Sequence, residues 1–235
     1  MISVIRCTKA EFLKSKRSIL LYIHFMIPVF GAMIFAGYFH ISSWNVVTKV
    51  SAYLEVLAVS FPFLVGIVVG MIVQIENQAG HFQLMLGTIP SRTATYLGKL
   101  VFLVIGAISA VVLALGVFCI IYWEAPLWIC LKAGSLLMMC AIPLYLIHLF
   151  VGMSFGKGAS MGLGIAGSLI SALMITGLGD DIWKYVPWAW GVRLADYTVL
   201  AWDKPDIFRV VQSDFMIGIW LSLIHISEPT RQEAI

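Results

Sequence analysis

Long uninterrupted runs of apolar residues place the strongest constraint on how this chain folds. A helix of about 20 apolar residues crosses a hydrocarbon core of roughly 30 Å. Runs of this length cover about residues 19–38, 52–73, 100–123, 133–151 and 159–178. The chain is also 61% hydrophobic and only 11% charged, which is far from the composition of soluble domains. We therefore expect an all-α polytopic membrane protein in which residues 1–220 form a single transmembrane domain.

A sixth apolar run begins near Phe215 but meets polar residues after about a dozen positions, which is too few to cross a membrane. These polar residues belong to the string LSLIHISEPTR at positions 221–231, which resembles the conceptual translation of a sequencing adapter. We therefore expect a sixth transmembrane helix that is truncated, and a non-native tail over residues 221–235. A genuine polar tail is the alternative, and resequencing the locus distinguishes the two.

Basic residues gather on one side of these predicted spans. The lead before the first span holds one acid, Glu11, and five basic residues, which are Arg6, Lys9, Lys14, Lys16 and Arg17. Arg92 and Lys99 follow the second span, and Lys157 follows the fourth. The positive-inside rule therefore places these segments in the cytoplasm. Apolar residues alternate with the charges of the lead. It is therefore either an amphipathic helix along the inner leaflet or flanking charge that only sets the topology.

Residues 76–99, ENQAGHFQLMLGTIPSRTATYLGK, form a polar interlude between the second and third predicted spans. Gly80 interrupts the preceding helix, and Pro90 ends a short helix-compatible stretch whose apolar residues include Phe82, Leu84 and Leu86. A short amphipathic helix that is connected at both ends to membrane helices can transmit a movement to them. The alternative is a solvated loop in which Glu76 only caps the end of a helix.

The spacing E-x3-G-x9-P-x-R-x6-K, formed by Glu76, Gly80, Pro90, Arg92 and Lys99, resembles the first cytoplasmic loop of ABC-2-type exporter permeases. Further similarity points to permeases of the lantibiotic immunity group. It is carried by E-x2-K-x-K-R-S at 11–18, by His24 with Pro28, by Phe61 with Pro62, and by W-x2-V-P-W-A-W-x2-R at 183–193. Together these patterns extend over nearly all of residues 1–220.

This resemblance implies a six-helix half-transporter in a bacterial cell membrane, paired with a second permease and a dimer of ABC ATPase subunits. It implies that the cargo is a lantibiotic-type amphipathic peptide, expelled for self-protection; an ABC-2 exporter of a lipid, a drug or another peptide is the alternative. The implied ATPase-coupling residues are Glu76, Gly80, Phe82, Leu84, Leu86, Pro90 and Arg92. The chain has no GxxxxGK[ST] motif, so we expect ATP and Mg on the partner and no enzyme activity here. Nucleic acid is not an expected partner.

A second candidate site lies between the fifth and sixth spans, on the predicted outer side. Its acidic and aromatic residues are Asp180, Asp181, Trp183, Trp188, Trp190 and Asp196. Such a surface suits a cationic amphipathic peptide, through charge attraction and cation–π contact. The alternative is purely interfacial, because Trp is enriched at membrane–water boundaries whatever the protein does.

Small residues are concentrated near the fifth predicted span, at positions 156–160 and 162–168. Small side chains let helix backbones approach closely in a membrane, where hydrophobic burial does not drive association. We therefore expect tight packing here, either inside the protomer or between two protomers.

Other classes of protein are less well supported. Residues 152–156, GMSFG, have the G-x-S-x-G form around Ser154, with His24 or His148 as a candidate base. That motif requires a strand-to-helix turn, which disfavours an intramembrane hydrolase. No CxxC, HExxH or clustered His/Cys pattern predicts a metal site. A membrane scaffold or sensor without transport stays open.

Overall fold

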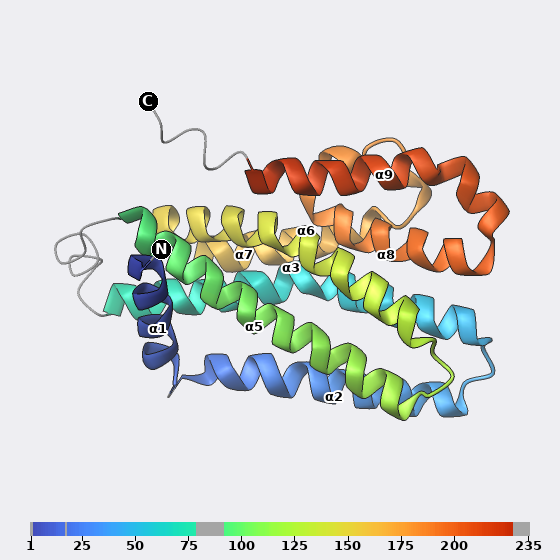
Figure 1. The fold of residues 1–235 in the computed structure, drawn as a ribbon, viewed down its shortest axis with the longest axis horizontal. Coiled ribbons are helices and arrows are strands. Elements are labelled where there is room, and N and C mark those ends of the chain that lie inside the picture. The colour runs from blue at the N-terminus through green and yellow to red at the C-terminus, as the bar shows by residue number, and fades with distance from the viewer. Residues whose placement is uncertain (1, 17, 79–91, 228–235) are drawn as a thin grey trace.

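The computed structural model describes residues 2–16, 18–78 and 92–227. These residues form helices without strands, which confirms the all-α prediction. The α-helices are α1 (Ile2–Ser15), α2 (Ile19–Ile41), α3 (Val46–Gln78), α5 (Arg92–Ile121), α6 (Leu127–Phe155), α7 (Lys157–Leu173), α8 (Pro187–Asp203) and α9 (Pro205–Ser227). Two 3-10 turns, η1 (Gly177–Gly179) and η2 (Trp183–Tyr185), lie between α7 and α8. Most helices run along one common axis, and α1 crosses them at one end (Figure 1).

Within the described residues, α2, α3, α5, α6 and α9 are long and apolar enough to cross a membrane. The protein is therefore a multi-pass membrane protein. The last of these helices differs from the sequence expectation, because it begins at Pro205 rather than near Phe215 and its apolar window spans Pro205–Ile224. One charged residue of this helix, Asp214, pairs with η2, since Lys184 Nζ lies 2.7 Å from its Oδ1. The prediction that residues 221–235 are non-native stays a prediction.

The fifth predicted span is also different, because α7 has only 17 residues and ends at Leu173. The chain then turns through η1 and η2 and continues as α8. Pro187 is the first residue of α8, a position where proline is favoured. Both α7 and α8 pack along α3. Helix α7 contacts the second half of α3, around Gly66 and Gly70, and α8 lines a cavity with the first half.

The contact between α3 and α7 depends on small residues. A Cβ atom on Gly66 would lie 2.7 Å from the carbonyl oxygen of Ser160 and 2.9 Å from Cα of Gly164, so neither glycine tolerates a side chain. The predicted close packing is thus found inside the protomer.

A serine of α7 also completes the hydrogen bonding of α3 next to a proline. Ser168 Oγ donates to the carbonyl oxygen of Val59 at 2.7 Å and accepts from the backbone N–H of Phe63 at 3.0 Å. Residues 59 and 63 are an i, i+4 pair, so the hydroxyl is inserted where a regular helix would have one backbone bond. Pro62 disturbs the ladder at this level, and Ser168 satisfies the groups that are released.

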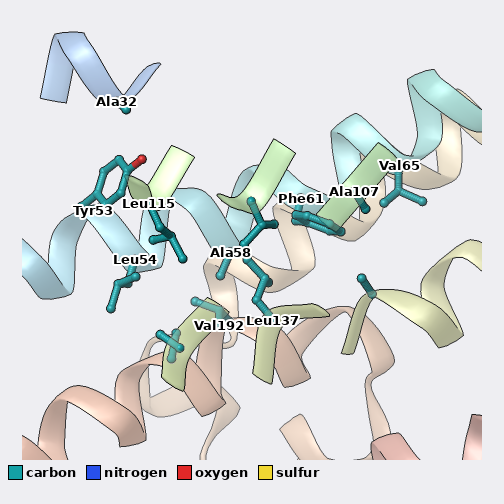
Figure 2. Packing of buried hydrophobic residues seen from close by; sticks show 14 of the residues in the cluster. Ala32, Tyr53, Leu54, Ala58, Phe61, Val65, Ala107, Leu115, Leu137 and Val192 are labelled. Atoms are coloured by element: carbon teal, nitrogen blue, oxygen red, sulfur yellow. The ribbon is translucent and has the colours of Figure 1, made fainter. Parts of the chain in front are cut away.

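Buried apolar side chains fill the spaces between helices in two clusters. The larger one joins α2, α3, α5, α6 and α8, and Figure 2 shows part of it, including Phe61, Leu115, Leu137 and Val192. The smaller cluster contains Trp183, Trp190, Tyr197 and Phe215 and fixes α9 and η2 on α8. The core therefore holds α8 rigidly between α3 and α9.

Candidate functional site

Helix α1 packs against the side of α5. Its buried residues, Thr8, Glu11 and Ser15, recur every three or four positions and so lie on one face. Thr8 Oγ1 donates to the carbonyl oxygen of Gly98 at 3.3 Å, and the close approach is made possible by Gly98. A Cβ there would lie 2.6 Å from Cβ of Cys7.

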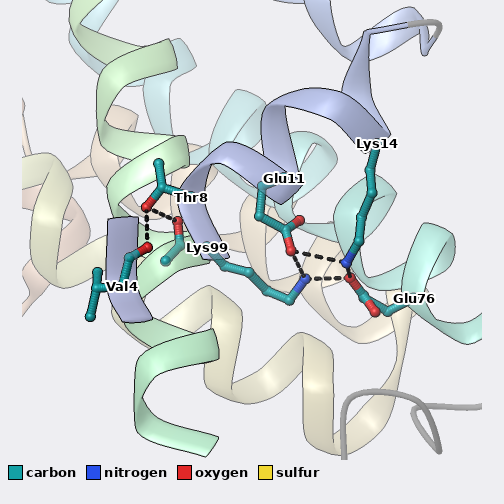
Figure 3. Close-up of polar contacts among 7 residues, drawn as sticks. Val4, Thr8, Glu11, Lys14, Glu76 and Lys99 are labelled. Carbon is teal, nitrogen blue, oxygen red and sulfur yellow. Dashed lines mark hydrogen bonds and ion pairs between the residues drawn. The ribbon is translucent and has the colours of Figure 1, made fainter. Parts of the chain in front are cut away.

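Four charged side chains meet where α1, α3 and α5 converge (Figure 3). Lys99 Nζ lies 2.7 Å from Glu11 Oε1 and 2.5 Å from Glu76 Oε1. Lys14 Nζ lies 2.5 Å from the same oxygen of Glu76 and 3.1 Å from Glu11 Oε1. Each lysine therefore bridges both carboxylates. We call these four residues the ion cluster.

The ion cluster is buried and electrically balanced. The side chains of Lys99, Glu11 and Glu76 are 1%, 5% and 8% exposed, whereas Lys14 is 40% exposed. Buried charges are tolerated only when they are paired, so removing one member leaves another uncompensated. Burial by itself lowers the pKa of Lys14, but the hydrogen bond and charge of Glu76 and the charge of Glu11 outweigh it, so the pKa of Lys14 is raised.

The ion cluster ties together the two helices that flank residues 79–91. Glu76 belongs to the last turn of α3, and Lys99 lies near the start of α5. Any force applied between these helices therefore reaches α1 as well. The predicted coupling residues Gly80, Phe82, Leu84, Leu86 and Pro90 lie outside the described residues, as does the side chain of Arg92.

Sequence reasoning identified Glu76 but not its partners. The pairing of Glu76 with a basic group of an ATPase stays a prediction, and in the structure its carboxylate binds two lysines of this chain. The signal for the cluster was the single acid, Glu11, in an otherwise basic lead.

The second predicted site is divided between the core and the surface. Trp183 and Trp190 are 0% and 1% exposed and belong to the smaller core cluster, so in this conformation they present no surface to a peptide. Trp188 packs on Gly167 of α7, and its backbone carbonyl accepts from Ser171 Oγ at 2.5 Å.

The acidic residues of this region have different roles. Asp180 is exposed and accepts from Arg193 Nη2 at 2.8 Å, and the same nitrogen donates to the carbonyl oxygen of Thr176 at 3.0 Å. Arg193 is buried, so these bonds fix the segment between α7 and η2 onto α8. Asp181 is exposed, and Asp196 is half-buried.

Asp196 lines a cavity of about 370 Å³ between α3 and α8. Its other lining residues include Trp44, Ser51, Glu55, Asp203 and Lys204. Burial raises the pKa of Asp196, and the nearby charge of Glu55 adds to this, while Arg193 opposes it. Sequence reasoning did not place Glu55 here, because α5, α6 and α7 lie between it and Asp196 in the chain.

The geometry does not support the alternative chemistries. Residues 152–155 form the last turn of α6, not a strand-to-helix turn. His148 Nδ1 lies 3.3 Å from Ser160 Oγ, and His24 Nδ1 lies 2.8 Å from the carbonyl oxygen of Leu20, so neither histidine is paired with Ser154. Among residues 2–16, 18–78 and 92–227, no group of three His, Cys, Asp or Glu side chains is arranged to hold a metal.

The long apolar helices define a multi-pass membrane protein. The sequence pattern of the family described as ABC-2 family transporter protein matches residues 7–173. The chain therefore belongs to the ABC-2 family, whose members are membrane subunits of transporters. Membership of this family implies an ABC ATPase as partner. No curated protein matched the chain. No solved structure matched it either.

Proposed function

We propose that this chain is the permease subunit of an ABC exporter that removes lantibiotic-type peptides from a bacterial cell membrane. A second permease would complete the transport path, and two ATPase subunits would bind ATP and Mg. The observation that carries the coupling part of this proposal is the ion cluster, because it joins the two helices on either side of residues 79–91.

Coupling would work through the rigidity of this junction. An ATPase that moves residues 79–91 would pull on the ends of α3 and α5. Since α3 also carries α7 and α8 along its length, the movement would reach the cavity at the other end of the bundle. Glu76 would act as a positioning residue, because its carboxylate is shared between Lys14 and Lys99.

Leu84→Asp is expected to abolish co-purification of the ATPase subunit while leaving the permease folded. A charged side chain in a predicted apolar contact would lose its hydration without gaining a partner. The measurement is affinity purification of the permease co-expressed with its ATPase subunit, together with the thermal unfolding midpoint of the permease. Leu178→Asp is the matched control, because Leu178 is 73% exposed and belongs to η1. Normal co-purification of Leu84→Asp would contradict docking through this segment.

The proposal for the cargo is based on the cavity between α3 and α8. It combines carboxylates of Glu55, Asp196 and Asp203 with the indole of Trp44, and the latter is exposed. Carboxylates attract cationic side chains, and an aromatic face favours them further. The cavity thus suits one lysine-like side chain of a cationic peptide, and the other peptide residues would contact the surrounding apolar surface.

The double variant Glu55→Gln, Asp196→Asn is expected to make cells about five- to thirtyfold more sensitive to a cationic lantibiotic, because it removes two contacts worth about 0.5–1 kcal/mol each. The measurement is the inhibitory concentration of the peptide for cells that express the complete transporter. Asp181→Asn is the control, since Asp181 is exposed and does not line the cavity. Unchanged protection by the double variant, or protection of wild-type cells only against a neutral drug, would favour another cargo.

A further inference from the structure

The position of α1 relative to the membrane follows from its contacts with α5. Phe12 packs edge-on against Phe102, with ring centroids 4.8 Å apart. Phe102 is about 15 Å along α5 from Arg92, at 1.5 Å per residue. Helix α1 therefore lies beside α5 rather than beyond its end, and it crosses the bundle axis instead of following it (Figure 1). This is the orientation of a helix that lies in the plane of the membrane interface.

The two faces of α1 are different in character. The face toward the bundle carries Thr8, Glu11 and Ser15, and its charge is neutralised in the ion cluster. The outward face mixes apolar and basic side chains that are exposed. Its apolar members are Ile5, Phe12 and Leu13, and its basic members are Arg6, Lys9 and Lys16.

The basic residues of the outward face have no carboxylate to pair with in the described part of the chain. The ion pairs of α1 there involve Glu11 and Lys14 and no other residue of the helix. Arg6, Lys9 and Lys16 therefore present three positive charges on the outward face of α1. Leu13 is 74% exposed between them, in a position to enter the acyl region.

We propose that the outward face of α1 is a binding site for anionic phospholipids. The phosphates of the head groups would pair with Arg6, Lys9 and Lys16, while Leu13 would insert below them. The depth of α1 beside α5 favours lipid over a cytoplasmic protein, because a protein would have to enter the head-group layer to reach this face. Basic residues near an anionic surface are attracted to it, and apolar residues add to the binding.

The site is connected to the rest of the molecule through α1 itself. Lipid bound to the outward face holds the helix against α5, and Glu11 and Lys14 on the same helix hold Lys99 and Glu76. Anionic lipid therefore stabilises the junction of α1, α3 and α5. This inference does not depend on the cargo of the transporter.

The test is a titration of phosphatidylglycerol into the full chain in neutral detergent, with bound lipid counted by native mass spectrometry. The triple variant Arg6→Gln, Lys9→Gln, Lys16→Gln is expected to bind about fivefold more weakly for each cation removed. Phosphatidylcholine should bind the wild-type chain as weakly as phosphatidylglycerol binds the variant. Lys132→Gln, Lys204→Gln, Arg209→Gln is the matched control, since these exposed cations lie on other helices or connections. Equal binding by wild type and triple variant would overturn the proposal.

A second measurement reports the location of the lipid without removing any charge. In the variant Leu13→Trp, the fluorescence of the new tryptophan should be quenched more strongly by brominated phosphatidylglycerol than by brominated phosphatidylcholine, after subtraction of the wild-type signal. Inorganic phosphate at millimolar concentration should displace little of this quenching, because it cannot replace the acyl chains. Equal quenching by the two lipids, or full displacement by phosphate, would overturn a site for anionic phospholipid.

Discussion

Lys99→Met is expected to lower the thermal unfolding midpoint of the purified chain by roughly 6–20 °C. Lys99 is 1% exposed and neutralises both Glu11 and Glu76, so its removal leaves two buried carboxylates to share the half-exposed Lys14. Removing one partner of a buried ion pair costs about 3–5 kcal/mol, and each kcal/mol shifts the midpoint by about 2–4 °C in a chain of this size. The measurement is thermal unfolding in detergent, followed by tryptophan fluorescence.

Two further variants separate the ion cluster from a general effect of lost charge. Arg209→Met removes a cation that lies 3.6 Å from Asp206, but both side chains are exposed, so the midpoint should hardly change. Glu76→Gln combined with Lys99→Met should recover part of the loss, because it leaves one neutral pair, Glu11 with Lys14. If Lys99→Met unfolds at the same temperature as Arg209→Met, the cluster does not hold α1, α3 and α5 together.

Gly66→Ala is expected to lower the midpoint by roughly 2–12 °C, because overpacking costs about 1–3 kcal/mol and each kcal/mol shifts the midpoint by about 2–4 °C. The new methyl group would lie 2.7 Å from the carbonyl oxygen of Ser160 and 2.9 Å from Cα of Gly164. Both atoms belong to backbone, so α3 and α7 must move apart. That movement would also weaken the bonds of Ser168 to Val59 and Phe63. Thermal unfolding measures the loss, and hydrogen exchange at Phe63 reports the separation.

Gly162→Ala is the matched control on α7, the helix that packs against Gly66. A Cβ there meets nothing within 4 Å, so the substitution should leave the midpoint unchanged or raise it slightly through helix propensity. Equal destabilisation by the two substitutions would show that the loss does not come from the contact between α3 and α7. No loss with Gly66→Ala would contradict the close approach of the two backbones.

The long helices were predictable because the physics that forms them is local. In a membrane, each apolar run has to satisfy its own backbone hydrogen bonds, which a helix does, and the thickness of the bilayer sets the length of that helix. Helices α2, α3, α5 and α6 therefore correspond to predicted spans. The last span was placed too late in the chain, since Asp206, Arg209 and Asp214 make its start look like a loop. Its charges are satisfied by neighbours such as Lys184, which only the fold brings close.

The candidate site was predictable only in part. Glu76 was identified from its spacing to Gly80 and Lys99, but the same spacing says nothing about which charges meet. Lys99 and Glu11 are separated by 88 positions and meet only because α1 lies on α5. Trp183 and Trp190 looked like an interfacial surface, yet both are enclosed, because η2 and α8 fold against α9.

The sequence by itself determined that this chain is a helical membrane protein of the ABC-2 type, because hydropathy, helix length and motif spacing are properties of contiguous residues. Only the tertiary structure decided which charges pair at the junction of α1, α3 and α5, that Gly66 and Gly164 touch, and that Glu55 and Asp196 share a cavity. The physical reason is that a buried charge or a close backbone contact requires a partner from another helix. The identity of that partner depends on how the helices are arranged in space.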